Sequence, residues 1–157
     1  TVTGLDPGSI QGDRAMLSIL DRMGARVDMG GGSVTVSPGR LRGIDVDVSD
    51  TPDLAPAIAL AALAAEGSTV VKNGGRLRFK ECDRISAIAT ELKRLGADID
   101  EAPDGFTIRG GGKLHGAACL CHNDHRIAML LIMAAECVSK SAPGFFDEYR
   151  QLGGSIS

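Results

Sequence analysis

The sequence predicts an α/β (α+β) fold of an unusual kind, an inside-out α/β barrel with its helices buried and its sheets outside. Three observations lead to this prediction. Residues 44–49 alternate strictly between apolar and polar side chains, which is typical of a strand with one face in water. Residues 57–65 and 127–135 are apolar on every side, so helices formed there must be buried. The order of strand, helix, three strands and helix occurs twice along the chain.

The two halves of the chain match each other at an interval of 70 to 73 residues. Such a regular interval indicates an internal repeat, with units at about 1–67 and 68–136 and a partial third unit at 137–157. The matching segments are Asp13-Arg14 with Asp83-Arg84, Met23-Gly24-Ala25 with Leu95-Gly96-Ala97, Gly39-Arg40-Leu41-Arg42-Gly43 with Gly112-Lys113-Leu114-His115-Gly116, and Asp53 with Asp124. Asp53 and Asp124 each precede an expected apolar helix.

The first unit is expected to contain a strand, a helix, a hairpin, a third strand and an apolar helix. The helix is predicted because apolar side chains recur at helical spacing between Asp13 and Met23, and Gly24 is a typical stop. A run of three glycines separates two β-type segments, which indicates a hairpin. These elements are expected at residues 1–5, 13–23, 26–29 with 33–37, 44–49 and 57–65.

The second unit is expected to follow the same order. Its first helix should open with Lys80 and end near Gly96, because Ile85, Ile88, Leu92 and Leu95 recur at helical spacing. A turn at Asp104-Gly105 indicates a hairpin. The strands are expected at residues 69–72, 98–100, 106–109 and 117–121, the apolar helix at 127–135, and a short helix of the third unit at 143–152 after Lys140.

Composition excludes several classes of function. The chain has 157 residues, 43% of them hydrophobic, and a net charge of −3, which argues against nucleic acid as a partner. No apolar segment is long enough to span a membrane, and neither end resembles a signal or transit peptide. The four cysteines and three histidines form no pair or cluster with metal-ligand spacing, so we expect reduced thiols, no metal and a cytoplasmic location.

Lys80 and Arg84 stand out because they lie four residues apart at the expected start of a helix, where the helix dipole disfavours cations. On a helix the two side chains would share one face and repel each other. Together with the free backbone N–H groups of that turn, they would bind a phosphate or a carboxylate strongly. The alternative is an ordinary charged face in contact with solvent.

Three motifs resemble the 5-enolpyruvylshikimate-3-phosphate synthase family. Together with Thr51-Pro52-Asp53 they cover nearly the whole chain in the family's order and spacing. The motifs are Leu77-Arg78-Phe79-Lys80-Glu81-Cys82-Asp83-Arg84-Ile85, Asn123-Asp124-His125-Arg126-Ile127-Ala128-Met129 and Lys140-Ser141-Ala142-Pro143.

The resemblance implies an enzyme that transfers the enolpyruvyl group of phosphoenolpyruvate to the 5-hydroxyl of shikimate 3-phosphate and releases phosphate, without a metal or organic cofactor. This is a step of the shikimate pathway to aromatic amino acids. Such a reaction needs acid–base groups for the hydroxyl and the methylene carbon, and cations for two phosphates and a carboxylate. The resemblance implies catalysis by Asp53 and Glu81. It implies substrate binding by Lys80, Arg84, Arg126 and Lys140.

Each of these residues also has a simpler interpretation. Asp53 could cap the apolar helix that follows it, and Glu81 could complement a helix dipole. Lys140 could be a surface lysine, and Cys82 is expected to fill space and not to act as a nucleophile. His125 is expected to be structural, either orienting Arg126 or capping a helix.

The chain also departs from the family pattern. The family has two such domains, and the partner domain is absent here, as is an N-terminal segment with a further lysine and arginine. About ten residues, including a strand, are expected between Ala135 and Glu136 and are missing. Arg76 stands where some members have an asparagine near the shikimate ring. We therefore expect an inactive fragment; the alternatives are a UDP-N-acetylglucosamine enolpyruvyl transferase or a non-catalytic anion-binding domain.

Overall fold

The computed structural model describes the backbone of residues 1–141 and the side chains of residues 1–134. The first unit contains β1 (Val2–Thr3), η1 (Gly12–Arg14), α1 (Ala15–Met23), β2 (Arg26–Gly30), β3 (Ser33–Ser37), β4 (Asp45–Asp47), η2 (Pro52–Leu54) and α2 (Ala55–Leu63). The second unit contains β5 (Ser68–Lys72), η3 (Gly75–Phe79), α3 (Arg84–Arg94), β6 (Asp98–Ala102), β7 (Gly105–Arg109) and α4 (His125–Ser141).

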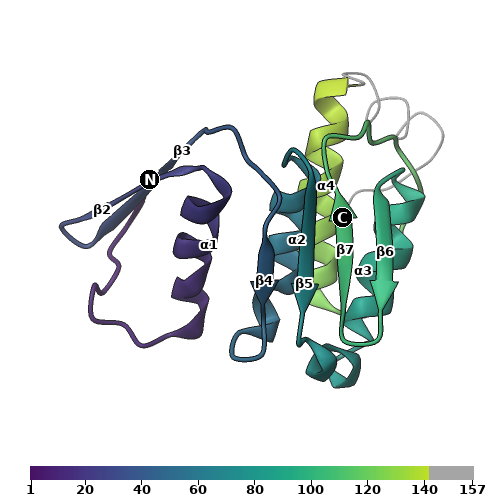
Figure 1. Ribbon diagram of the computed structural model, residues 1–157, viewed down its shortest axis with the longest axis horizontal. Coiled ribbons are helices and arrows are strands. Elements are labelled where there is room, and N and C mark those ends of the chain that lie inside the picture. Colours follow the sequence, from purple (N-terminus) through teal and green to yellow (C-terminus); the bar gives the residue numbers. More distant parts are fainter. Residues whose placement is uncertain (142–157) are drawn as a thin grey trace.

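The two sheets repeat one topology. One sheet has the strand order β1-β3-β2 and the other β4-β5-β7-β6, and in each unit the middle strand is antiparallel to both of its neighbours. β4 belongs to the first unit by sequence but pairs in parallel with β5, with Val46 opposite Val71. The last strand of the first unit therefore lies in the sheet of the second unit, which ties the two together (Figure 1).

The ends of helices α1 and α3 have equivalent backbone geometry. Helices α1 and α3 both end at a glycine with positive φ, 103° at Gly24 and 89° at Gly96, a conformation that favours glycine over residues with a side chain. Ala25 N donates to Leu20 O and, 72 residues later, Ala97 N donates to Leu92 O. The predicted correspondence of 70 to 73 residues is thus present in the backbone as well as in the sequence.

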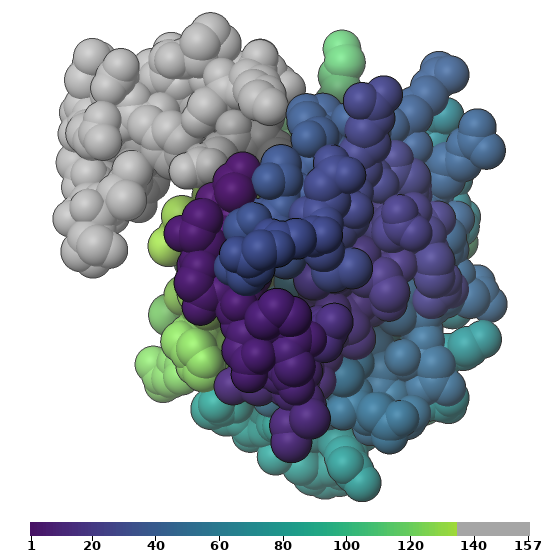
Figure 2. Space-filling view, turned by 90° about the vertical axis from the view of Figure 1, so that its left-hand side faces the viewer, coloured from purple at the N-terminus to yellow at the C-terminus, as the bar shows by residue number. Residues whose placement is uncertain are grey.

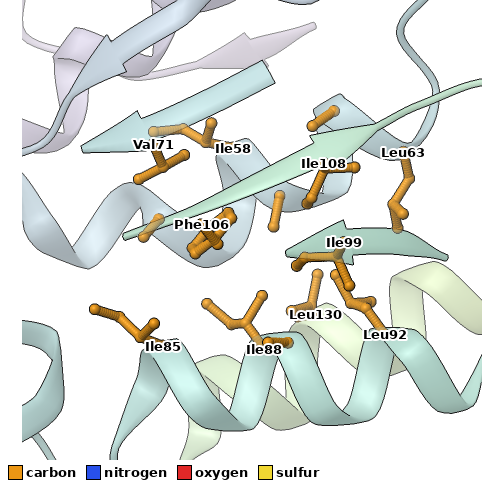
Figure 3. Packing of buried hydrophobic residues seen from close by; sticks show 14 of the residues in the cluster. Ile58, Leu63, Val71, Ile85, Ile88, Leu92, Ile99, Phe106, Ile108 and Leu130 are labelled. Atoms are coloured by element: carbon orange, nitrogen blue, oxygen red, sulfur yellow. The ribbon is translucent and has the colours of Figure 1, made fainter. Parts of the chain in front are cut away.

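Apolar side chains fill the space between the second sheet and the helices behind it (Figures 1 and 3). Val71, Phe106 and Ile108 point from the sheet toward Ile85 and Ile88 of α3. Burying a side chain of this size contributes about 1.5–3 kcal/mol. The opposite face of the sheet carries exposed charged residues, namely Asp45, Asp47, Lys72, Asp98, Asp100 and Arg109. The prediction of helices inside and sheets outside is therefore confirmed for the described residues.

The start of the central helix differs from the prediction. Helix α3 begins at Arg84, because the Asp83 side chain accepts a hydrogen bond from Ser86 N at 3.0 Å and so caps the helix. Lys80 precedes the helix with an extended backbone. Lys80 and Arg84 therefore do not share a helical face, and the expected repulsion between stacked cations was wrong. Ile85, Ile88, Leu92 and Leu95 are all buried, as predicted.

Residues 117–121 do not form the predicted strand. They run alongside α3, where Leu120 N donates to the Glu91 carboxylate at 3.0 Å. Their counterpart in the first unit, β4, is a strand because it pairs with the first strand of the next unit. Among residues 1–141 no such strand follows the second unit, so residues 117–121 have no strand to pair with.

Helix α4 is longer than predicted and continues to Ser141. The expected unit boundary at 136 thus falls inside a helix, and Lys140 lies in the last turn of that helix. The helix expected at 143–152 lies outside the described residues.

Helix α4 is also not buried on all sides, since Met129, Ile132 and Met133 are exposed. It reaches the surface beside the N-terminal unit, which Figure 2 shows in purple and blue. No helix within residues 1–141 is long and apolar enough to cross a membrane.

Candidate active site

The beginnings of three helices meet in one cluster of charged side chains. Asp53 comes from η2 just before α2, Lys80 and Glu81 from the segment before α3, and Arg126 from the first turn of α4. Arg84 is the first residue of α3. The structure therefore brings together five of the six residues that the family resemblance indicated. Lys140 is fourteen positions beyond Arg126 in the same helix, roughly 20 Å away along the axis.

Three positively charged side chains surround the Asp53 carboxylate. Lys80 Nζ and Arg84 Nη1 each lie 2.9 Å from Asp53 Oδ1. Arg126 Nη2 lies 3.9 Å from Oδ2, and Arg126 Nη1 donates to the backbone oxygen of Asp53 at 3.2 Å. No side-chain cap hydrogen bond is present at the start of η2 or α2. The alternative that Asp53 caps the apolar helix is therefore not what the structure shows.

Arg84 binds three carboxylates at once and is the buried centre of the cluster. Its Nε donates to Asp124 Oδ2 at 2.7 Å, its Nη1 to Asp53, and its Nη2 to Glu81 Oε2 at 2.6 Å. The Arg84 residue is only 1% exposed. One planar guanidinium thus fixes the positions of both predicted catalytic carboxylates, Asp53 and Glu81.

Asp124 binds Arg84 and also caps the helix that follows. Its Oδ1 accepts hydrogen bonds from Arg126 N at 2.8 Å and Ile127 N at 3.3 Å, so Asp124 caps α4. His125 is exposed at the first position of the helix and does not provide that cap. Cys82 Sγ lies 3.7 Å from Asp124 Oδ2. Burial and the charge of Asp124 raise the pKa of Cys82 to about 11, which supports the expectation that this thiol is not a nucleophile.

Protonation in the cluster follows from these contacts. Burial raises the pKa of the Asp53 carboxyl, but the hydrogen bond from Lys80 and the charges of Arg126 and Arg84 outweigh it, so the pKa lies below 3.8. Burial likewise raises the pKa of Asp124, but the hydrogen bonds from Arg84 and from two backbone amides outweigh this effect, so the pKa of Asp124 also lies below 3.8. Both of these carboxyls are therefore ionised at neutral pH.

The solvent-accessible part of the cluster consists of Lys80, Arg126 and Asp53, which together form its rim. Lys80 and Arg126 side chains are each 30% exposed and Asp53 is 36% exposed, whereas Asp124 is completely buried. A hollow of about 200 Å³ begins at Asp53 and Arg126 and continues between α2 and α4. A second cavity, of about 520 Å³, is lined by the segment between β1 and α1 and by the β2–β3 hairpin. The second cavity contains none of the predicted site residues, so the rim of the ion cluster is the better candidate.

Sequence reasoning missed the buried carboxylate of Glu91 and the contact between Asp124 and Arg84. Both signals were present in the helical spacing. Glu91 follows Ile88 by three residues and precedes Leu95 by four, so it lies on the apolar face of α3. Arg84 lies four residues before Ile88 on the same face, which indicates burial of its side chain. A charged residue on such a face needs a buried partner.

The fold is shared with solved enolpyruvyl transferases. An EPSP synthase from Acinetobacter baumannii superimposes on 86% of this chain and 38% of its own, with a TM-score of 0.66 and 32% identity. The enolpyruvyl transferase NikO from Streptomyces tendae covers 81% of this chain and 30% of its own, with a TM-score of 0.60 and 27% identity.

The chain belongs to the EPSP synthase (3-phosphoshikimate 1-carboxyvinyltransferase) family, whose sequence model matches residues 1–148. A 3-phosphoshikimate 1-carboxyvinyltransferase from Methanothrix thermoacetophila is 49% identical over 169 residues, covering 99% of the chain and 40% of the relative. One from Clostridium perfringens is 43% identical and covers 97% and 39%.

The chain thus spans about two fifths of the length of the curated relatives it matches. The alignment with the Methanothrix relative extends over 169 positions although the chain has only 157 residues. The relative therefore carries residues within the matched region that this chain lacks. This agrees with the expectation that about ten residues of the family pattern are missing from this chain.

Proposed function

We propose that the chain provides one domain of a transferase that moves the enolpyruvyl group of phosphoenolpyruvate to the 5-hydroxyl of shikimate 3-phosphate. The observation that carries the proposal is the convergence of Lys80, Arg84 and Arg126 on the half-exposed carboxylate of Asp53. Cations held this closely at helix starts bind a phosphate or carboxylate well. Family membership supports the choice of substrates.

In this proposal Lys80 and Arg126 bind the anionic groups of the substrates at the rim, while Arg84 stays in place beneath them. An arriving phosphate or carboxylate competes with Asp53 for the same two rim cations. Asp53 then loses part of the positive charge that keeps its pKa low, and its pKa rises toward a useful range for a base. Anion binding and the basicity of Asp53 are coupled in this way.

The reaction then takes two steps. The substrate hydroxyl oxygen bonds to the central carbon of the enol group, its proton passes to Asp53, and Glu81 donates a proton to the methylene carbon. Next the Glu81 carboxylate removes a proton from the resulting methyl group, the double bond forms again, and the bond from carbon to the phosphate oxygen breaks. The departing phosphate takes up the proton held by Asp53, so both carboxyl groups return to their starting state. Arg84 contacts both carboxylates, so it fixes their positions relative to each other beside the reacting carbons.

A role for Lys140 in binding phosphoenolpyruvate is harder to support, since it lies in the last turn of α4, remote from Arg126. The partner domain of the family would supply the remaining cations and close the site against water.

We further propose a cytoplasmic location. Cys82, Cys119 and Cys121 are free thiols, as a reducing compartment favours.

The test is release of phosphate with both substrates present. The 157-residue chain alone should release none above background. A chimera in which this chain replaces the matching 40% of the Methanothrix relative should release phosphate only when shikimate 3-phosphate is added. Release dependent on a UDP-sugar instead would replace the proposed acceptor. A folded chimera that binds phosphoenolpyruvate without turnover would favour a non-catalytic anion-binding domain.

A further inference from the structure

Glu91 is a completely buried carboxylate that the proposed mechanism does not use. It lies on α3 two turns after Arg84, about 10 Å further along the axis, at 0% exposure. Its Oε1 lies 2.8 Å from His122 Nε2, and its Oε2 accepts hydrogen bonds from Leu120 N at 3.0 Å and Arg94 Nη1 at 3.2 Å. An isolated buried charge would be costly, so this set of partners is closely fitted.

These contacts attach one short segment to α3 at both of its ends. Glu91 binds the segment at Leu120 and His122, and Arg84 binds it at Asp124. Between these two attachments the backbone takes the left-handed conformation at His122 and Asn123, with φ of 53° and 56°. Most residues with side chains adopt this conformation less readily than glycine does, so the contacts on either side help to hold the turn.

We propose that Glu91 and His122 are positioning residues for the ion cluster. By fixing the turn at residues 122–123, they set where Asp124 lies. Asp124 in turn orients the Arg84 guanidinium and, through its hydrogen bond to Arg126 N, the first turn of α4. The link to catalysis rests on the proposed function, but the effect on Arg84 and Asp124 does not.

The groups that contact the Glu91 carboxylate stabilise its negative charge. Burial raises its pKa, but the hydrogen bonds from His122 and Leu120 and the charges of Arg94 and His122 outweigh it, so the pKa lies below 4.5. The other titratable group nearby is the Cys119 thiol, which donates to Glu91 O, and burial and Glu91 raise its pKa. Glu91 therefore keeps its charge at neutral pH.

Two substitutions test the proposal in the 157-residue chain. His122→Asn removes the partner of Glu91, while asparagine tolerates the left-handed backbone. Glu91→Gln keeps the size of the side chain but removes its charge. The matched control is His115→Asn, since His115 lies in the same connection between β7 and α4, is exposed and has its ring hydrogen bond to Gly116 and not to Glu91. Glu91→Gln carries the test if His122→Asn does not fold.

The readout is hydrogen exchange at the Arg84 Nε–H group, which donates to Asp124 in the buried centre. In His122→Asn and Glu91→Gln we expect exchange at this group to become at least about tenfold faster, or roughly 1.4 kcal/mol, with unchanged exchange at the core amide of Ile88. His115→Asn should change neither. Unchanged Arg84 exchange in both variants would overturn the proposal, and so would equal acceleration at Arg84 and Ile88, which indicates general loss of stability. Because no substrate is used, a failure here differs from failure of the proposed function.

Discussion

Arg84 Nε and Asp124 Oδ2 lie 2.7 Å apart, and both side chains are shielded from solvent. This contact joins the start of α3 to the start of α4 across 40 residues of sequence. A buried ion pair of this kind is weak evidence for stability in itself, since both charges lose their hydration. It does fix geometry, because leaving either charge without its partner is strongly unfavourable.

The first prediction concerns the stability of this pair. Asp124→Asn leaves the buried Arg84 guanidinium without its full counter-charge and should lower the free energy of unfolding by about 3–5 kcal/mol. The measurement is urea denaturation of the 157-residue chain. Asp98→Asn is the matched control, because Asp98 lies 2.8 Å from Arg109 at the surface and should matter little. Similar losses in the two variants would show that burial of the pair is unimportant.

The second prediction is a dependence on pH. The pKa of Asp124 is lower in the folded chain than the ordinary value of 3.8, so its contribution to stability is present above that value. As the pH falls below 3.8, the unfolded chain takes up the proton first, and the contribution is lost as the pH approaches the folded pKa. Melting temperatures between pH 7 and pH 2 should fall less steeply at the acid end in Asp124→Asn. An unchanged acid slope would contradict the assignment.

The third prediction separates substrate binding from folding at Arg126. In the active chimera, Arg126→Ala should weaken phosphoenolpyruvate binding by roughly 10- to 150-fold, or about 1.5–3 kcal/mol, through loss of a charge-assisted contact. Binding of shikimate 3-phosphate should change far less. Dissociation constants for each substrate, measured by calorimetry, decide the question. Equal losses for the two substrates would mean that Arg126 serves the fold.

The fourth prediction concerns the two carboxylates that Arg84 bridges. Asp53→Asn and Glu81→Gln should each reduce kcat of the chimera by about two to four orders of magnitude, the usual range for general acid–base groups. Circular dichroism should show that both variants remain folded. Asp50→Asn, a nearby exposed carboxylate, is the control and should keep full turnover. A variant of Asp53 or Glu81 with unchanged kcat would remove that residue from the mechanism.

Much of the fold could be predicted because it depends on patterns within short segments. The αL glycines Gly24 and Gly96 and the buried face of α3 follow from spacing alone. The repeat added long-range information, since matching residues 70 to 73 apart must occupy equivalent places. It placed Asp53 and Asp124 before equivalent helices, which is where they lie.

Two of the three failures have a common physical cause, because they depended on contacts between distant segments. Residues 117–121 have the alternation of a strand, yet a strand needs a partner, and none follows them in the described chain. The start of α3 depended on whether the Asp83 side chain caps it. The spacing within α3 places Glu91 on the apolar face, but its partners lie on a segment some 30 residues away and could not be identified from that spacing.

The most direct test of the central claim is a titration of the 157-residue chain with phosphoenolpyruvate, followed by amide and side-chain chemical shifts. If the rim of the ion cluster is the anion site, saturable changes should centre on Lys80, Arg84 and Arg126, with a dissociation constant in the millimolar range (about −4 kcal/mol), because the site is open to water. Changes centred on the 520 Å³ cavity near Arg14, or no saturable change at all, would contradict the account.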